Sequence, residues 1–253
     1  MTSRFSLATL TILAIGFPIV SFAQSADPQP SPEQLPAYTI EFIQYRPDGT
    51  SARHIEAYKS DGSHSLAGLR KDGTFQVDIV LSAQDQSRTE LHHDVRSKTT
   101  WYGPNHGIMP WIPKDPTCET LDQSPSHTES MIGKDVFLGF TVVKRMTQLS
   151  NGDTYESWQA PALGCKEIFS RHTKKDPDPD ELYYPETAAT KITLGEPNPV
   201  WFEIPADYDE RPPSQVREVR YAKSGLTMTE SRKESLRMQD EQYWSSQTYK
   251  PAK

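Results

Sequence analysis

The chain has 253 residues, of which 35% are hydrophobic and 24% charged, and its formal net charge is −7. Nucleic-acid binding needs a basic stripe that an acidic chain of this kind lacks, so we exclude nucleic acid as a partner. Aliphatic residues are few, but 10% of the residues are aromatic. The composition therefore predicts a lean folded domain with polar ends, not a wholly disordered chain.

Residues 1–23 have the layout of an export signal. Arg4 precedes an almost wholly apolar run over residues 5–20, and small residues stand just before the predicted cleavage between Ala23 and Gln24. We therefore expect a protein that is periplasmic or secreted and has no membrane span after signal cleavage. The alternative is an uncleaved anchor, because the apolar run is nearly long enough to cross a bilayer.

Cys118 and Cys165 are the two cysteines of the chain. Exported proteins meet an oxidising compartment, where an even cysteine count favours a disulfide. We therefore predict a bond between Cys118 and Cys165. The alternative is a pair of free thiols or a nucleophile, although no Cys-x-x-Cys motif is present.

Composition divides the chain into four parts. Prolines crowd the stretch after the signal and predict an extended linker. In the last part, Val216, Val219 and Leu226 keep helical spacing among charged residues, and we expect helices that pack poorly on the body. The parts are a signal peptide at 1–23, a Pro-rich linker at 24–36, a β domain at 37–205 and a polar, partly helical or disordered C-terminal segment at 206–253.

Alternating apolar and polar residues predict an antiparallel series of strands in the first half of the β domain. Asp-Gly pairs separate the first four runs, and this dipeptide between such runs is a strong hairpin signal because both residues tolerate positive φ. The runs lie at residues 38–42, 52–59, 64–70, 75–81, 88–92 and 99–102, and the Asp-Gly pairs at 48–49, 61–62 and 72–73.

Residues 103–125 are predicted to form a long Pro-rich loop, because their prolines prevent regular structure. We expect this loop to fold back onto the sheet, tied by Cys118. Beyond it, the most apolar strand is predicted to run from Met131 to about Leu149. Further strands are predicted at residues 154–159, 164–172, 190–194 and 200–204.

Two segments resemble parts of a known family. They are Gly133-Lys-Asp-Val136 with Gly139-Phe-Thr-Val142 and Asn151-Gly-Asp-Thr-Tyr-Glu156-Ser-Trp158-Gln-Ala-Pro161, and later Glu196-Pro-Asn-Pro-Val-Trp-Phe-Glu-Ile-Pro205. They resemble a hairpin and a closing strand of uncharacterised exported bacterial proteins of the LolA/LppX-like, lipoprotein-sorting type. The resemblance implies an incomplete antiparallel barrel that carries lipid or lipoprotein.

The fold class that we expect is mainly β. A single antiparallel meander sheet is curved into an incomplete barrel, with a long Pro-rich loop and a polar C-terminal helical segment. The chain departs from the family pattern in having no amphipathic helix between the linker and the first strand, and in its low aliphatic content.

The sequence carries no motif for catalysis, nucleotide binding or metal binding. Gly-x-Ser-x-Gly, the glycine patterns of nucleotide sites and His-Glu-x-x-His are absent, so we predict no catalytic residue, no metal and no cofactor. The run His92-His93-Asp94 could suggest a metal, but adjacent strand side chains point to opposite faces. Strand carboxylates leave open a hydrolase without a recognisable motif; they are Glu41, Glu56, Glu90 and Glu156.

Aromatic residues beside Gly and Pro mark the candidate ligand-binding site. Trp101, Tyr102 and Trp111 lie where the Pro-rich loop begins, and such residues can form a platform for an apolar or sugar ligand. The ordinary alternative is that they plug one end of a thin sheet.

These observations favour a non-enzymatic β-rich binding or carrier module for an apolar ligand or a protein partner in the cell envelope. One alternative is an envelope protein–protein interaction module that acts through its C-terminal segment. The other is the hydrolase without a recognisable motif.

Overall fold

The computed structural model describes residues 36–103, 115–175 and 184–251. The predicted signal peptide, its cleavage position at Ala23 and Gln24, nearly all of the linker and Trp111 lie outside the described residues. The described strands are β1 (Tyr38–Tyr45), β2 (Ser51–Tyr58), β3 (His64–Leu69), β4 (Phe75–Ser82), β5 (Ser87–His92), β6 (Ser97–Tyr102), β7 (Gln123–Ser124), β8 (His127–Phe137), β9 (Phe140–Leu149), β10 (Thr154–Ala160), β11 (Lys166–Thr173), β12 (Glu186–Leu194) and β13 (Asp209–Glu210). The helices are α1 (Pro213–Ser224) and α2 (Glu230–Ser246), with 3₁₀ turns η1 (His93–Val95), η3 (Pro161–Leu163), η4 (Pro199–Phe202) and η5 (Gln247–Tyr249).

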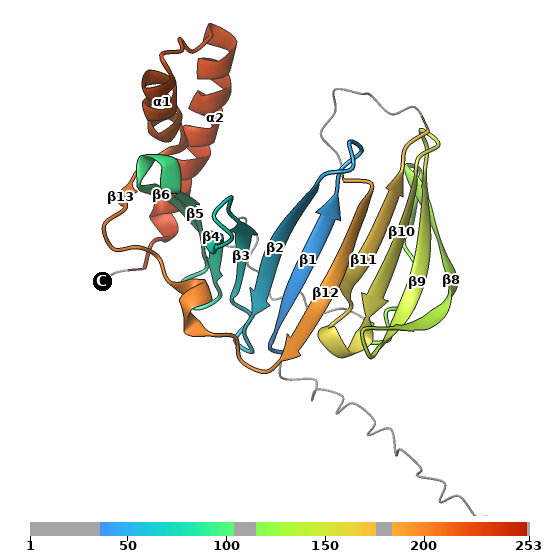
Figure 1. Ribbon diagram of the computed structural model, residues 1–253. Helices are drawn as coiled ribbons and strands as arrows, with labels where there is room; N and C mark the ends of the chain where they lie inside the picture. The colour runs from blue at the N-terminus through green and yellow to red at the C-terminus, as the bar shows by residue number, and fades with distance from the viewer. Residues whose placement is uncertain (1–35, 104–114, 176–183, 252–253) are drawn as a thin grey trace, which may run out of the picture.

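All of these strands belong to one open sheet (Figure 1). Strands β1 to β6 follow one another across one half, and β12 to β7 follow in reverse chain order across the other. The halves meet where β12 pairs with β1. The sheet ends at β13 on one side and at β7 on the other, so it is not closed into a barrel. The predicted mainly β, incompletely closed fold is confirmed, with the parallel pair β13–β6 as an exception to the antiparallel pattern.

The three Asp-Gly pairs lie in the turns that join β1 to β4, as predicted. Positive φ falls on the glycines alone, with 81° at Gly49, 87° at Gly62 and 83° at Gly73. Each aspartate contributes in another way, because its carboxylate accepts the backbone N–H two residues further on. The position of the turns was therefore predicted correctly, and the left-handed conformation falls on the glycine of each pair.

The apolar segment predicted as one strand over Met131–Leu149 is a hairpin. Strands β8 and β9 pair around a two-residue turn in which φ is 51° at Leu138 and 85° at Gly139. Such a turn needs two successive left-handed residues, and Leu gives no sequence signal for that conformation. Residues 200–204 are also not the predicted strand, since Pro199 opens the 3₁₀ turn η4 there.

The main core lies on the face toward which the sheet curves. Lys166 of β11 reaches Glu56 of β2, with Nζ 2.5 Å from the carboxylate, although β1 and β12 lie between these strands. In a flat sheet the backbones of β2 and β11, three strand spacings apart, would lie about 14 Å from each other. We therefore infer that the sheet curves toward this face, and we call it the concave face. The buried residues of the core are Tyr38, Ile40, Phe42, Phe140, Val142, Ala160, Leu163, Ile168 and Ala189.

A disulfide fastens the end of the Pro-rich loop to the opposite, convex face. The sulfur atoms of Cys118 and Cys165 lie at bonding distance, with the Cα atoms 5.6 Å apart. Both residues are buried against Val143 of β9. The predicted pairing is therefore present, and it supplies a small apolar cluster on a face where the core is otherwise thin.

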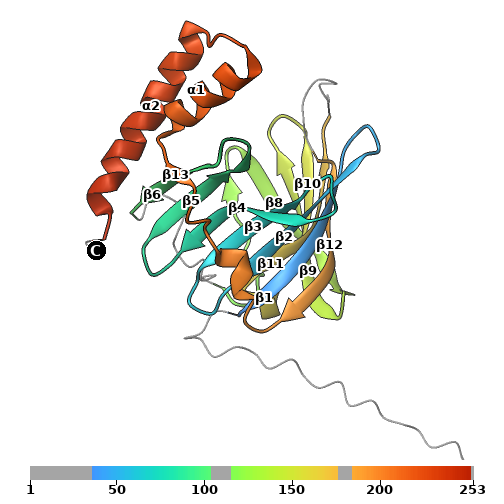
Figure 2. The ribbon, with the colours of Figure 1, turned by 60° about the vertical axis from the view of Figure 1, so that its left-hand side comes forward.

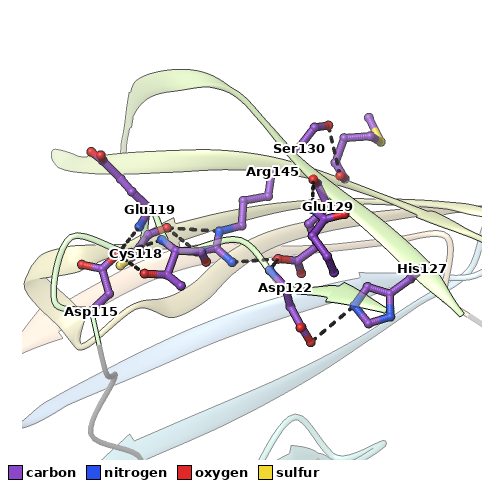
Figure 3. A network of polar contacts seen from close by, with 11 residues as sticks. Asp115, Cys118, Glu119, Asp122, His127, Glu129, Ser130 and Arg145 are labelled. Carbon is purple, nitrogen blue, oxygen red and sulfur yellow. Dashed lines mark hydrogen bonds and ion pairs between the residues drawn. The ribbon is translucent and has the colours of Figure 1, made fainter. Parts of the chain in front are cut away.

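Arg145 of β9 adds a polar tie beside the disulfide (Figure 3). Its guanidinium donates to the backbone carbonyls of Cys118 and Thr120 and pairs with the Glu129 carboxylate at 3.2 Å. Asp115 orders the same stretch, because its carboxylate accepts the backbone N–H of Thr120 at 2.7 Å. The strap formed by residues 115–122 is thus held by one covalent bond and by a buried cation.

The C-terminal segment packs more closely on the body than predicted. The hairpin of α1 and α2 lies beside the β6 end of the sheet (Figure 2), and Val216, Leu236 and Tyr243 are each 3% exposed. The ring of Tyr243 meets that of Trp101 edge-on at 6.4 Å. Only part of the apolar content of this segment is buried, since Leu226, Met238 and Trp244 remain exposed. No helix within the described ranges has the length and apolar character needed to cross a membrane.

Candidate functional site at the helical end of the concave face

A row of directly paired residues crosses the concave face from β1 to β6. Each residue is the cross-strand partner of the next, so the six side chains lie on one face. The rings of Tyr38 and Tyr58 lie 4.8 Å apart, and Tyr58 stacks on His64 at 5.0 Å. The row consists of Tyr38, Tyr58, His64, Leu81, Arg88 and Trp101.

Beside this row, Glu56 holds a buried polar cluster. Its carboxylate accepts a hydrogen bond of 2.6 Å from the Tyr58 hydroxyl and pairs with Lys166. Burial alone would raise the pKa of Glu56, but the contact with His54 and the charge of Lys166 outweigh it and hold the pKa well below its usual range. Burial and the neighbouring carboxylate raise the pKa of the Tyr58 hydroxyl. The hydrogen bond from Tyr58 and the ion pair with Lys166 give the buried Glu56 carboxylate its partners, and the ion pair links β2 to β11.

Glu56 and Glu90 share this face, with strands β3 and β4 between them. Each carboxylate already has a counter-ion, because Glu56 pairs with Lys166 and Glu90 pairs with Arg88 at 2.6 Å.

A groove lies between the helical hairpin and the Trp101 end of the row. Its volume is about 430 Å³. Because β5 and β6 residues alternate between the two faces, side chains two apart on these strands line the groove together. Helix α1 contributes residues three and four apart, which share one helix face. The lining residues are Arg88, Glu90, His92, Thr99, Trp101, Pro213, Val216, Arg217, Arg220, Leu236, Gln239 and Gln242.

His92 enters the groove in its neutral form. Burial and the nearby charges of Arg220 and Arg217 lower its pKa to about 4. Thr99 donates its hydroxyl proton to a backbone carbonyl, so the His92 ring nitrogen Nε2, 3.1 Å away, is assigned as the donor to the Thr99 oxygen. The other ring nitrogen, Nδ1, then faces the Arg220 guanidinium at 3.5 Å as an acceptor.

Arg220 docks α1 on the turn that follows β5. It donates two hydrogen bonds of 2.7 Å to the Asp94 carboxylate, a two-pronged geometry that fits a planar guanidinium. These bonds hold the pKa of Asp94 below its usual range. The groove therefore has one wall from the sheet and one from the hairpin, with a fixed ion pair at their junction.

The structure divides the predicted aromatic platform. Trp101 lines the groove, half-buried, with the Arg88 guanidinium 5.9 Å from its ring. Tyr102 points to the opposite face, where the Lys250 ammonium lies 5.6 Å from its ring, because adjacent strand residues alternate. Trp111 lies outside the described residues. Trp101 therefore packs against α2, through Tyr243, and does not share a surface with Tyr102.

Sequence reasoning passed over the arginines of α1. Arg217 and Arg220 lie three residues apart beside the buried Val216, and such spacing places them on one helix face. This periodicity was visible in the sequence, but nothing in it indicated which strand that face would meet.

The adjacent histidines His92 and His93 do not share a site. His92 lines the groove, whereas His93 contacts the Tyr208 hydroxyl at 2.7 Å on another side of the sheet.

Comparison with known proteins finds architectural likeness only. No protein-family model and no curated protein matches the chain. A chain of the Pseudomonas aeruginosa MucA/MucB complex matches with a TM-score of 0.40 and 13% identity over 70% of this chain, which spans 58% of that one. An uncharacterized conserved protein from Thermus thermophilus matches with a TM-score of 0.44 and 6% identity, over 70% of this chain and 90% of that one.

A LolA superfamily protein from Nitrosomonas europaea also matches, with a TM-score of 0.28 and 8% identity over 71% of this chain and 94% of that one. The distant structural resemblance thus includes the family named from the sequence motifs. Such low identities concern the arrangement of strands and say nothing of shared ligands.

Proposed function

We propose that the chain is an exported, non-enzymatic binding or carrier module of the cell envelope, and that its ligand enters the groove between the helical hairpin and the sheet. The observation that carries this proposal is the groove itself. Its volume of about 430 Å³ falls in the range of small-molecule sites, which combine an apolar wall with a few placed polar groups. Trp101 supplies the apolar wall, and the side chains of β5 and α1 supply the polar groups.

Two features support export. Residues 1–23 have the layout of a cleavable signal, and the cysteine pair at bonding distance suits an oxidising compartment. Expression of the given sequence with export should yield a protein whose intact mass corresponds to a chain that begins at Gln24. A mass that retains residues 1–23 would contradict cleavage.

Uptake of the apolar dye Nile red, followed by its fluorescence, tests the groove. Trp101→Leu should reduce dye binding, because it removes the aromatic wall. Trp244→Leu is the matched control, since Trp244 is 58% exposed and does not line the groove. Gln239→Trp provides a second test, because Gln239 is exposed and lines the groove, so a larger side chain there takes up groove volume without removing a buried contact. Dye binding that neither groove variant changes would contradict the proposal.

The helical hairpin favours a second candidate function, the binding of an envelope protein. Leu226, Met238 and Trp244 are 64%, 54% and 58% exposed on it. Removing residues 206–253 would also remove β13 and the buried Tyr243, so point variants are the cleaner test. Met238→Ser with Trp244→Ser should abolish cross-linking to an envelope partner, and unchanged cross-links would eliminate this candidate.

A further inference from the structure

We propose that the groove selects small organic anions, in which a carboxylate or phosphate is joined to an apolar part, and that Arg217 receives the charge. This inference rests on the proposed function and names the class of ligand for the same groove.

The first step is the charge of the lining. Three arginines and a single carboxylate line the groove, whereas the whole chain carries a formal net charge of −7. Positive charge is therefore concentrated where the chain average is negative. A cleft with an excess of one sign of charge in its lining attracts ligands of the opposite sign.

The second step is that two of the arginines already have counter-ions. Arg88 is paired with Glu90 at 2.6 Å, and Arg220 with Asp94 at 2.7 Å. Arg217, which is half-buried, has no hydrogen-bond or ion-pair partner among the described residues. A partly desolvated cation without a counter-ion gains from an anion that reaches it.

The third step is the direction in which Arg217 faces. It lies one turn before Arg220 on α1 and lines the groove with it, and its charge reaches His92 across the groove. A guanidinium presents two parallel donors that match a carboxylate or a phosphate. The buried Val216 and Leu236 and the ring of Trp101 lie in the same groove, so the apolar part of the ligand has a surface beside the charge.

The fourth step is size. A volume of about 430 Å³ suits a small molecule, because pockets of a few hundred Å³ enclose ligands of drug size. We therefore assign the anion to a small molecule.

Calorimetric titration of the full chain with octanoate, octyl phosphate and octyl glucoside tests the inference. The three probes share an apolar tail and differ in the head group, so the first two also distinguish a carboxylate from a phosphate ligand. We expect both anions to bind at least about tenfold more tightly than octyl glucoside, since hydrogen bonds to charged groups discriminate by this order.

Arg217→Gln should weaken anion binding by about tenfold or more, and Arg217→Lys should weaken it less, because it keeps the charge and loses the planar fork. Arg237→Gln is the matched control. It removes the same charge from an exposed site on α2, where Arg237 pairs with Glu234 and Glu241. Arg217 has no partner to lose among the described residues, so the circular dichroism spectrum and thermal midpoint of Arg217→Gln should match those of the wild type.

Equal anion affinity in Arg217→Gln and the wild type would overturn the inference. Octyl glucoside binding as tightly as the anions would also overturn the inference. If binding of the probes still depended on Trp101 in either case, the proposed function would stand. If no probe binds, or if binding ignores both Trp101→Leu and Gln239→Trp, the proposed function fails together with the inference.

Discussion

Opening the disulfide should remove much of the stability of this domain. Cys118→Ala with Cys165→Ala releases a loop of 47 positions. Chain entropy assigns about 4 kcal/mol to the closure of a loop of this length at 25 °C. Both cysteines are nearly fully buried, so Ala is preferred to Ser, which would bury an unpaired hydroxyl. We expect the free energy of unfolding to fall by about 4 kcal/mol, a large share of the 5–15 kcal/mol typical of domains.

Equilibrium urea unfolding, followed by circular dichroism, measures this loss. The wild type in the presence of reductant should match the double variant, because both lack the bond. The double variant itself should not respond to reductant. A loss below about 1 kcal/mol, or a wild type that is indifferent to reductant, would refute the reasoning.

Arg145 sharpens the test, because it holds the same strap. Arg145→Met leaves Glu129 and two backbone carbonyls without their cation, which should cost about 3–5 kcal/mol. Once the disulfide is absent, the strap can move away and find water for these groups. The loss caused by Arg145→Met should then be smaller, and strictly additive losses would show that the two ties act independently.

Two further predictions concern the other elements of the sheet. Glu56 has a pKa below its ordinary value of 4.5 in the folded state, so its contribution to stability is complete above pH 4.5 and is lost as the pH falls through the folded-state pKa. Glu56→Gln should flatten the fall in stability below pH 4.5, measured by urea unfolding at several pH values, and a curve parallel to that of the wild type would contradict this role. Leu138→Asn should raise the free energy of unfolding by about 0.5–1 kcal/mol, because Asn tolerates the left-handed backbone better than Leu; Leu138 is exposed and takes φ of 51°. A lower thermal midpoint would contradict that prediction.

Local patterns were sufficient for most of the strands. The alternating residues 75–81 lie in β4, and the Asp-Gly turns separate β1 to β4 as predicted. Both signals are readable from the sequence, because the alternation of apolar residues and the conformation of a turn depend only on near neighbours. The cysteine pair was accessible for a similar reason, since two cysteines allow a single pairing. The hairpin at Leu138 was not predicted, because nothing in the sequence indicates that a leucine takes the left-handed conformation there.

The candidate site was accessible only in part. Trp101 was proposed as a ligand contact from its aromatic character, and it lines the groove, but Arg217 and Arg220 of the same lining lie more than a hundred residues away in a segment that was predicted to pack loosely. Their encounter depends on β13 pairing with β6 and on Tyr243 packing against Trp101. Such contacts are set by which surfaces remain uncovered once the sheet has formed.

The sequence by itself therefore determined the kinds of elements: strands, turns, a polar helical end and one cysteine pair. Only the tertiary structure decided that β12 inserts beside β1, that Lys166 reaches Glu56 across two strands, and that an arginine with no counter-ion among the described residues lines the same groove as Trp101. The physical reason is range. Backbone conformation responds to neighbours a few positions away, whereas a binding groove forms where two buried surfaces, distant in the chain, fail to close completely.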